Sequence, residues 1–217
     1  MNFKAINTEL GNADLFLVDL ILKGFFKEGS VLLDAGCGEG RNLTYFLRNN
    51  FRVFGIDLNY TAIRMLRMAG RSRYPNLEPG NFIHGDILNH PFADRFFDYV
   101  LCFSVLHHAR DESHFHRMIA SLTGTLKIEG ILVIGMNSEL RTENEGIQTQ
   151  NCSLPHEEAG QRLMLNPAIL HSIRGKSDLA LSEPVKTWII DGQEAMSYLV
   201  LKKKIKLLEK LKKPTDE

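Results

Sequence analysis

The chain has few cysteines, no excess of charge of either sign and no long apolar run. Its three cysteines, Cys37, Cys102 and Cys152, are scattered and form no CxxC pair, which excludes a disulfide framework and is typical of a reducing compartment. No apolar stretch approaches the ~18 residues that a membrane-spanning helix needs, and MNFKAINTEL lacks the pattern of a signal peptide. We therefore expect a cytoplasmic protein with no membrane partner.

A balanced charge and a missing motif narrow the function classes. The 26 basic residues equal the 26 acidic ones, which argues against a surface built mainly for nucleic-acid phosphates. The GxxxxGK[ST] pattern of P-loop proteins is absent. With 217 residues, 44% of them hydrophobic, and no repeat or Pro/Gly-rich linker, the sequence predicts one domain over 1–217.

Short apolar runs alternate with segments of helical periodicity through the first two thirds of the chain. This alternation predicts an α/β fold with a mostly parallel sheet and helices on both faces. The expected strands are 31–34, 51–59, 81–87, 97–106 and 130–137, and the expected helices are 13–27, 41–50, 60–72 and 114–126.

The alternation stops after residue 137. Residues 137–170 are polar and aperiodic, and a loop of this length in a compact domain is usually functional or disordered. We expect a short helix over 166–174, then an antiparallel hairpin of 185–190 and 196–201 turned at Asp191-Gly192. The lysine-rich tail, 202–217, has the periodicity of an amphipathic helix, either simply solvated or in contact with RNA or a membrane.

The stretch VLLDAGCGEGRN, residues 31–42, predicts a ligand lying against bare backbone. It departs from the dinucleotide pattern GxGxxG, because Gly36 and Gly38 fit but Arg41 stands at the third position and Gly40 comes one residue early. Asp34, two residues before Gly36, would repel a pyrophosphate and can accept hydrogen bonds from an ammonium group. S-adenosylmethionine, with a cationic amino-acid end and no phosphate, fits this loop.

Two further acids end the next two predicted strands. Asp57 lies 21 residues after Gly36, where a carboxylate can accept both ribose hydroxyls, with Leu58 beside it. Asp86 can accept from an exocyclic adenine amine, and Ile87 offers its backbone and an apolar wall. One strand-end aspartate is more often a helix cap or turn former, but three such acids meet at one crevice of an open α/β sheet.

These motifs resemble those of the class I S-adenosylmethionine-dependent methyltransferases. DAGCGEG is similar to the family's glycine-rich motif, GDI to its adenine-side motif, FDYVLCFSVLHH to its fourth-strand motif, and LKIEGILVIG to its fifth strand and the preceding turn. The turn departs from the family's Pro-Gly or Gly-Gly pair, with Ile128-Glu129-Gly130 instead. The resemblance implies a Rossmann-like seven-stranded sheet closed by an antiparallel hairpin. Within the family, GRN and the hairpin look like type 11/12 or tellurite-resistance enzymes, and the HH pair looks like a tRNA-wobble group.

Together, the residues and the resemblance define an expected cofactor set. It comprises Asp34, Gly36, Cys37, Gly38, Gly40, Arg41, Asp57, Leu58, Asp86, Ile87 and Phe103. Cys37 is interpreted as a small buried residue, because no base lies near it in sequence. For Arg41 and Asn42, contact with the cofactor carboxylate and simple helix initiation are both open.

Methyl transfer from a sulfonium is an in-line displacement, so the protein supplies mainly proximity, alignment and exclusion of water. A general base matters only where the acceptor must lose a proton. His107 and His108 follow the fourth strand and are the candidate bases, with capping or shielding of the cofactor as the alternative. Ser104 and Phe103, at the same strand end, are expected to contact the cofactor or the acceptor. His114 and His116 do not share a helix face, so we expect no metal site.

The leading hypothesis is a methyltransferase that acts on a small molecule. An N-terminal helix within 1–28 and a substrate-side insertion, 137–183, would enclose the acceptor. The alternatives are an RNA nucleoside methyltransferase, which the lysine-rich tail favours, and a non-catalytic S-adenosylmethionine-binding regulatory protein.

Overall fold

A computed structural model describes residues 2–74, 77–140, 162–176, 178–190 and 194–205. The α-helices are α1 (Phe3–Leu10), α2 (Leu15–Leu22), α3 (Thr44–Arg48), α4 (Tyr60–Arg73), α5 (Glu112–Thr125) and α6 (Pro167–Arg174), and the 3₁₀ turns are η1 (Pro79–Asn81) and η2 (Leu106–His108). The strands are β1 (Val31–Ala35), β2 (Arg52–Asp57), β3 (Phe82–His84), β4 (Phe97–Phe103), β5 (Leu126–Asn137), β6 (Leu179–Leu181), β7 (Lys186–Ile190) and β8 (Glu194–Lys203).

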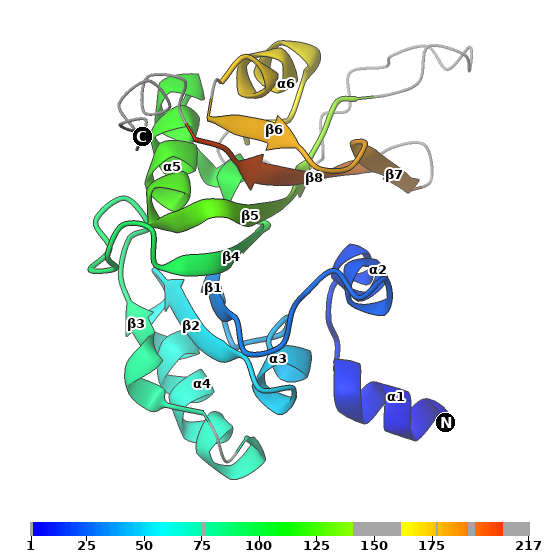
Figure 1. Ribbon diagram of the computed structural model, residues 1–217, viewed down its shortest axis with the longest axis vertical. Helices are drawn as coiled ribbons and strands as arrows, with labels where there is room; N and C mark the ends of the chain where they lie inside the picture. Colours follow the sequence, from blue (N-terminus) through cyan, green and yellow to red (C-terminus); the bar gives the residue numbers. More distant parts are fainter. Residues whose placement is uncertain (1, 75–76, 141–161, 177, 191–193, 206–217) are drawn as a thin grey trace, which may run out of the picture.

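The strands form one sheet in the order β3-β2-β1-β4-β5-β8-β6, with β7 also paired to β8 (Figure 1). The first five are parallel and β8 is antiparallel to β5. The chain reverses direction across the sheet at β1, since β2 lies on one side of it and β4 on the other. Such a switch point opens a crevice at the carboxyl ends of the strands, where ligands bind in open α/β sheets. The predicted fold class is confirmed.

The far edge of the sheet differs from the seven strands that we expected. β6 pairs with the end of β8 and β7 with its beginning, so both lie on the same outer edge of β8. Residues 182–185 interrupt what is otherwise one edge strand, so the described part of the chain contains eight strands. The hairpin of β7 and β8 is confirmed, and its predicted turn at Asp191-Gly192 lies outside the described residues.

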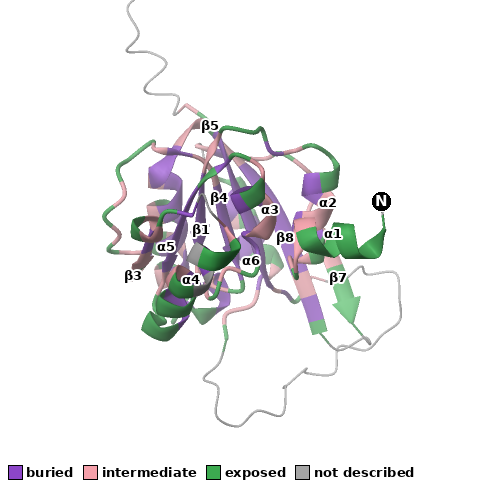
Figure 2. Ribbon diagram, turned by 90° about the horizontal axis from the view of Figure 1, so that it is seen from below, coloured by how far each residue is buried: buried purple, intermediate pink, exposed green. Residues whose placement is uncertain are grey.

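The helices cover both faces of the sheet (Figures 1 and 2). On one face α5 and α6 pack Phe115, Ile119 and Ile169 against buried strand residues. On the other, α2, α3 and α4 contribute a second cluster that includes Phe16 and Phe46. The strands between these layers are buried on both sides, which explains why their sequences are continuous apolar runs.

The N-terminal region corrects our expectation of one helix. It contains two, α1 and α2, and α1 has no buried residue. Asp14 begins α2 by accepting a hydrogen bond from the Phe16 amide at 2.9 Å, and Gly24, with φ of +67°, follows its end. Among the described residues, no helix is both long and apolar enough to cross a membrane.

The expected strands 81–87 and 97–106 are shorter in the structure, as β3 and β4, and the expected strand 130–137 begins earlier, as β5. Two other segments differ more from the sequence prediction. The helix expected over 41–50 is only α3, because residues 41–43 form turns in which the Leu43 amide donates to the Gly40 carbonyl. The predicted tail begins inside β8, where the Lys203 ammonium donates to the carbonyls of Thr123, Gly124 and Leu126 at the junction of α5 and β5. Residues 206–217 lie outside the described part of the chain.

The turn Ile128-Glu129-Gly130 precedes the apolar half of β5, and its left-handed backbone explains why the family favours glycine there. Glu129 has φ of +67°, in the left-handed region, and its carboxylate pairs with Lys202 at 2.5 Å. The departure therefore places a strained residue in a surface turn and leaves the carboxyl edge of the sheet unchanged.

Candidate active site

The glycine loop between β1 and α3 is built from left-handed backbone. Gly36, Gly38 and Gly40 have φ of +82°, +50° and +84°, and the Gly36 and Cys37 amides donate to the Ile56 carbonyl of β2. A Cβ on Gly36 would lie 2.1 Å from Cγ2 of Val105, whereas one on Gly38 would meet no atom within 4 Å. The loop therefore packs against Val105 at Gly36 and leaves open space beside the backbone at Gly38, where a ligand can approach the main chain.

Asp34 is a buried carboxyl at the end of β1. Its side chain is 2% exposed, and burial, followed by the charge of Asp57, raises its pKa to about 7 against the opposing effect of Arg41. At neutral pH the group is thus poised between its two protonation states. A cation beside it would favour the carboxylate, which fits the ammonium group predicted from the sequence.

Asp57 ties the end of β2 to the glycine loop. One carboxylate oxygen accepts the Gly38 amide at 2.7 Å, and the other accepts the Asn59 amide at 2.7 Å. The structure therefore brings Asp34, Gly38 and Asp57 together, as the sequence predicted. Leu58, the next residue, has a side chain that is 70% exposed, so an apolar surface stands open beside the carboxylate.

Asp86 and Ile87 follow β3 at the same edge. Asp86 accepts the Leu88 amide at 2.8 Å in a turn, and Ile87 is buried with its carbonyl accepting from Ser121. The turn-forming role that we considered for a strand-end aspartate thus holds for Asp86. Its side chain is partly exposed at the edge of the sheet, which leaves it within reach of a ligand there.

The end of β4 holds a strained residue. Phe103 is buried, and the following Ser104 is exposed with φ of +59°, its amide donating to the Gly135 carbonyl at 2.8 Å. Left-handed backbone in a residue other than glycine costs about 1–2 kcal/mol, and such strain gathers at functional sites. Ser104 is thereby held at the crevice with its side chain open to solvent.

The two candidate bases differ sharply. His107, in η2, is 5% exposed, and burial, with the charges of His108 and Arg162, lowers its pKa to about 4. Its Nδ1 has no hydrogen-bond partner among the described residues, while its backbone carbonyl accepts the Leu163 amide at 3.0 Å. His108 is exposed, with its ring 4.3 Å from that of His107. Of the two, His107 is thus the buried neutral imidazole.

The contacts of His114, His116 and Cys37 agree with the structural roles that we expected for them. His114 accepts the Arg110 amide, and His116 contacts Glu112 and Ser172, so the two do not share a ligand. No group of three metal-ligating side chains occurs in the described part of the chain. Cys37 is buried beside Gly55, and burial raises the pKa of its thiol, which leaves it un-ionised.

A polar cluster that the sequence analysis missed closes the crevice from the N-terminal side. The Asp14 amide donates to Asn42 Oδ1 at 3.0 Å, and its Oδ2 accepts from the Tyr198 hydroxyl at 3.4 Å and lies 4.0 Å from Arg41. Tyr198 stacks on Phe16 at 4.6 Å between ring centroids. Asp14 stands before an apolar run as a helix cap does, but its partner in β8 is 184 residues away in sequence.

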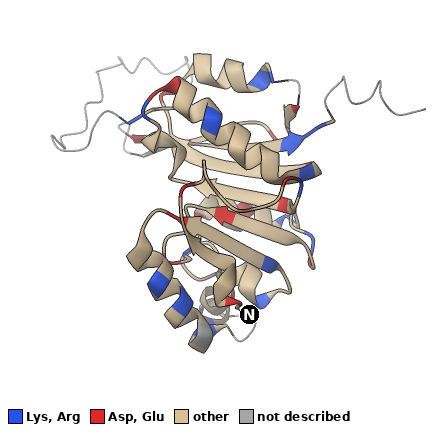
Figure 3. Ribbon diagram, turned by 90° about the vertical axis from the view of Figure 1, so that its left-hand side faces the viewer, with Lys and Arg blue, Asp and Glu red and all other residues tan. Residues whose placement is uncertain are grey.

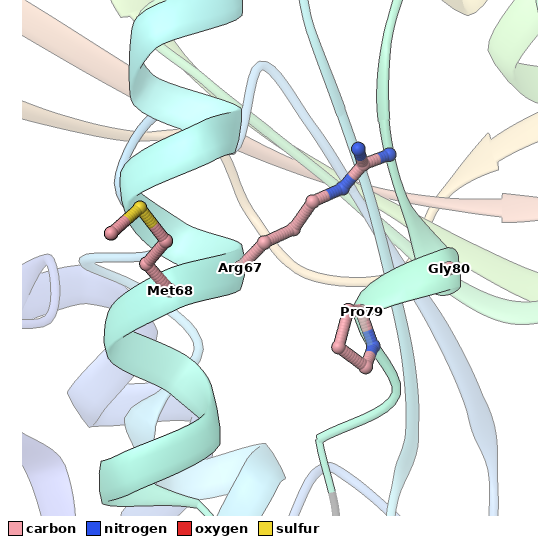
Figure 4. Close-up of a pocket in the computed structure, with 4 residues that line it drawn as sticks. All are labelled: Arg67, Met68, Pro79 and Gly80. Atoms are coloured by element: carbon pink, nitrogen blue, oxygen red, sulfur yellow. The ribbon is translucent and has the colours of Figure 1, made fainter.

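Figure 4 shows a separate hollow between α4 and η1, with a volume of about 570 Å³. Arg67, Met68, Pro79 and Gly80 line it. The Arg67 guanidinium donates to the Phe82 carbonyl and so serves to hold α4 to β3. The hollow brings together none of the predicted site residues, and we assign it no role.

The residues present fit S-adenosylmethionine. The open Cα of Gly38, the paired acids Asp34 and Asp57, and the exposed Leu58 offer a bare cradle, acceptors for an ammonium and for hydroxyls, and an apolar surface. The fold and these groups are those expected of a Rossmann-like methyltransferase domain.

Comparison with known proteins agrees with this class. The methyltransferase domain family matches residues 33–134. A phthiotriol/phenolphthiotriol dimycocerosates methyltransferase of Mycobacterium tuberculosis is 29% identical over 153 residues, covering 69% of this chain and 52% of the relative. A tRNA (carboxymethyluridine(34)-5-O)-methyltransferase of Arabidopsis thaliana is 29% identical over 106 residues, covering 49% of this chain and 24% of the relative.

Solved structures give the same fold. The [4+2]-cyclase SpnF superposes with a TM-score of 0.68 at 17% identity, covering 88% of this chain and 81% of that one. A magnesium protoporphyrin IX methyltransferase from Synechocystis with bound S-adenosylmethionine superposes with a TM-score of 0.63 at 16% identity, covering 88% and 77%. The chain spans about half the length of the Mycobacterium tuberculosis methyltransferase that it matches. The family match over residues 33–134, just under half of the chain, and these structures agree on the Rossmann-like fold of S-adenosylmethionine-dependent methyltransferases.

Proposed function

We propose that this protein transfers the methyl group of S-adenosylmethionine to a small-molecule acceptor. The observation that carries the proposal is the aromatic wall at the carboxyl edge of the sheet. The Tyr198 ring stacks on Phe16 and lies 6.3 Å from that of Phe103 and 6.4 Å from that of Trp188. Phe16, Phe103 and Tyr198 are buried and Trp188 is 42% exposed, so the aromatic wall gives this edge of the sheet a rigid, mostly apolar backing, which favours a compact, partly apolar acceptor over an extended polymer.

When bound, the cofactor supplies a methyl group on a good leaving group, so the chain's task is to hold and orient the partners. Burial, with the neighbouring charge of Asp14, raises the pKa of Tyr198 to about 12, and its hydroxyl therefore stays protonated as a hydrogen-bond donor. We propose that Tyr198 and Asp14 orient a polar group of the acceptor. The N-terminal segment and the part of the 137–183 insertion that the structure describes would flank it.

The test is a methyl-transfer assay with radiolabelled S-adenosylmethionine on metabolite fractions and on bulk tRNA, beside calorimetric titration of the cofactor. We expect cofactor binding and label transfer to the small-molecule fraction. Asp57→Asn is the control, and should weaken cofactor binding about 10- to 100-fold, since one charge-assisted hydrogen bond contributes about 1.5–3 kcal/mol. Label in tRNA would favour the RNA hypothesis, and binding without transfer to any acceptor would favour the regulatory one.

We further propose His107 as the base for acceptors that must lose a proton. With its pKa lowered to about 4, the imidazole is neutral throughout the neutral range, but it is a weaker base than an unperturbed imidazole, so its contribution to the rate lies at the low end for a general base. We expect His107→Gln to lower kcat about 100-fold with little change in KM, a typical loss for a general base. His108→Gln, a change in the exposed neighbouring ring, is the control and should keep most of the rate.

The pH profile separates this role from a structural one. Wild-type kcat should stay flat from about pH 5.5 to 8, because His107 is already deprotonated there. Loss of thermal stability with an unchanged kcat in His107→Gln would show that the ring only packs.

The two buried cysteines of the described chain, Cys37 and Cys102, are both free thiols, which supports our proposal of a cytoplasmic location.

A further inference from the structure

Basic and acidic residues are segregated along this neutral chain. Residues 41–74 contain seven arginines, no lysine and one acidic residue, Asp57, so the rest of the chain carries the compensating negative charge. Figure 3 shows basic bands along α4 and no acidic one. Arginine without lysine is the composition used for bidentate recognition of phosphate or carboxylate groups.

Three of these arginines line one groove, here called the arginine groove. It has a volume of about 600 Å³, within the range of sites for small ligands. Its walls come from the end of α1 and the following turn, from the glycine loop with α3, and from α4. The charged residues among those that line it are Arg41, Arg48, Arg73 and Glu39. Asp34, Asp57 and the aromatic wall are not part of this lining, so the groove adjoins the site proposed for methyl transfer and has only residues of the glycine loop in common with it.

The guanidinium groups in the groove are loosely paired. Arg41 lies 4.0 Å from Asp14 and Arg48 lies 3.9 Å from Glu9, at the outer limit of an ion pair. The exposed fractions of the two arginine side chains are 52% and 36%. Ion pairs of this length to exposed arginines contribute little, and leave most of the guanidinium N–H donors to solvent. Arg67 of α4 differs, because it is engaged by the Phe82 carbonyl.

An aromatic ring and polar side chains complete the groove. The Arg48 guanidinium lies 5.9 Å from the centre of the Tyr74 ring, whose hydroxyl is 2.9 Å from the Thr44 hydroxyl. Asn7 and Asn12 add amide groups. Arg48 and Arg73 stand at the ends of α3 and α4, where a cation also complements the helix dipole. That role does not require both arginines and Arg41 to line the same groove.

We propose that the arginine groove binds a small phosphate-bearing ligand. Two or three guanidinium groups from separate elements can grip the non-bridging oxygens of a phosphate ester, and Tyr74 offers a face for its organic part. The groove shares Gly40 and Arg41 with the cofactor loop, so this ligand would lie next to the cofactor without occupying its acids.

The test is calorimetric titration of the full chain with inorganic pyrophosphate. We expect saturable one-site binding, weakened at least tenfold in Arg48→Ala and in Arg73→Ala. Arg64→Ala is the matched control, because Arg64 is an exposed arginine of α4 that does not line the groove, and it should leave binding unchanged. S-adenosylmethionine binding should be unaltered in all three variants, so failure of this proposal and failure of the methyltransferase proposal are distinguishable.

Two further measurements make the test more specific. Arg48→Lys and Arg73→Lys keep the charge and the fold but lose the planar fork, and we expect them to weaken pyrophosphate binding severalfold. A 12-nucleotide single-stranded RNA tests a polymeric source of phosphate. The proposal is overturned by the absence of saturable pyrophosphate binding, by equal losses in Arg64→Ala and the groove variants, or by RNA binding in preference to pyrophosphate.

Discussion

Asp34→Asn is expected to stabilise the cofactor-free protein at pH 8 and, at the same time, to weaken S-adenosylmethionine binding. Asp34 is fully buried, with a pKa raised from 3.8 to about 7. Between these values the folded protein holds a proton that the unfolded chain has lost, so stability falls as pH rises from about 4 to 7 and stays low above it. A shift of about three pKa units corresponds to ~4 kcal/mol, of which we expect about 2–4 kcal/mol to be recovered by the amide.

The loss of binding follows from the same carboxylate. An ammonium group beside Asp34 favours its ionised form, so cofactor binding near pH 6 should release a proton, and wild-type affinity should fall about tenfold per pH unit below 7. The neutral amide that Asp34→Asn introduces cannot form a charge-assisted pair. We expect about 10- to 100-fold weaker binding at pH 8, and no dependence of affinity on pH in the range where the wild type titrates.

His107 opposes Asp34 in the same pH window. Its folded pKa is lowered to about 4 from an ordinary 6.5, so the unfolded chain binds the proton first and stability is lost as pH falls from about 6.5 to 4. In the wild type the two groups partly cancel, which gives a shallow dependence of stability on pH. Removing the Asp34 carboxyl should expose the His107 slope, and Asp34→Asn should lose stability steeply on acidification.

Thermal and urea unfolding from pH 4 to 8 measure these slopes. Asp86→Asn is the control, since Asp86 is a partly exposed aspartate at the same edge of the sheet that accepts the Leu88 amide. It should bring no gain in stability at pH 8. A less stable Asp34→Asn protein at pH 8, or a pH slope equal to that of the wild type, would contradict the assignment of Asp34 as a desolvated carboxyl.

Local patterns predicted the parts of the fold that depend on neighbours in sequence. The parallel strands β1, β4 and β5 consist mostly of buried apolar residues, and Asp34 and Asp57 lie at the carboxyl ends of β1 and β2. β6 has three residues, and its pairing with the end of β8 is tertiary, so no local signal could mark it. α1 has no buried residue. A helix is recognised in a sequence by the periodic apolar positions that face the core, and α1 has no face packed against the core.

The same distinction between local and long-range contacts applies to the residues of the candidate site. Asp57 and Gly38 are 19 residues apart and meet because β1 and β2 are adjacent parallel strands, which the motif spacing anticipates. Asp14 and Tyr198 meet only because β8 inserts antiparallel beside β5, with Gly135 leaving room for the rings of Phe103 and Tyr198. The net charge of zero gives no sign of the arginine-rich segment 41–74, because acidic residues elsewhere in the chain balance it.

Gly38→Ala is expected to abolish measurable S-adenosylmethionine binding while it costs only about 1–2 kcal/mol of stability. Gly38 has φ of +50°, which an alanine adopts at a cost of about 1–2 kcal/mol, but no atom lies within 4 Å of the added methyl group in the protein itself. The methyl group would instead fill the bare cradle where the cofactor must approach the backbone. We expect at least a 100-fold loss of affinity in calorimetric titration, with a fold that remains intact by circular dichroism.

Two other glycines separate strain from steric exclusion. Gly29, with φ of +78° and nothing within 4 Å, lies before β1, away from the carboxyl edge of the sheet. Gly29→Ala should therefore show the same small loss of stability with normal cofactor binding. Gly36→Ala should cost several kcal/mol, because its methyl group would collide with Val105 at 2.1 Å. If Gly38→Ala instead bound the cofactor as well as Gly29→Ala does, the open space beside Gly38 would not be the cofactor cradle, and Asp34 and Asp57 would have to face a ligand held elsewhere along the crevice.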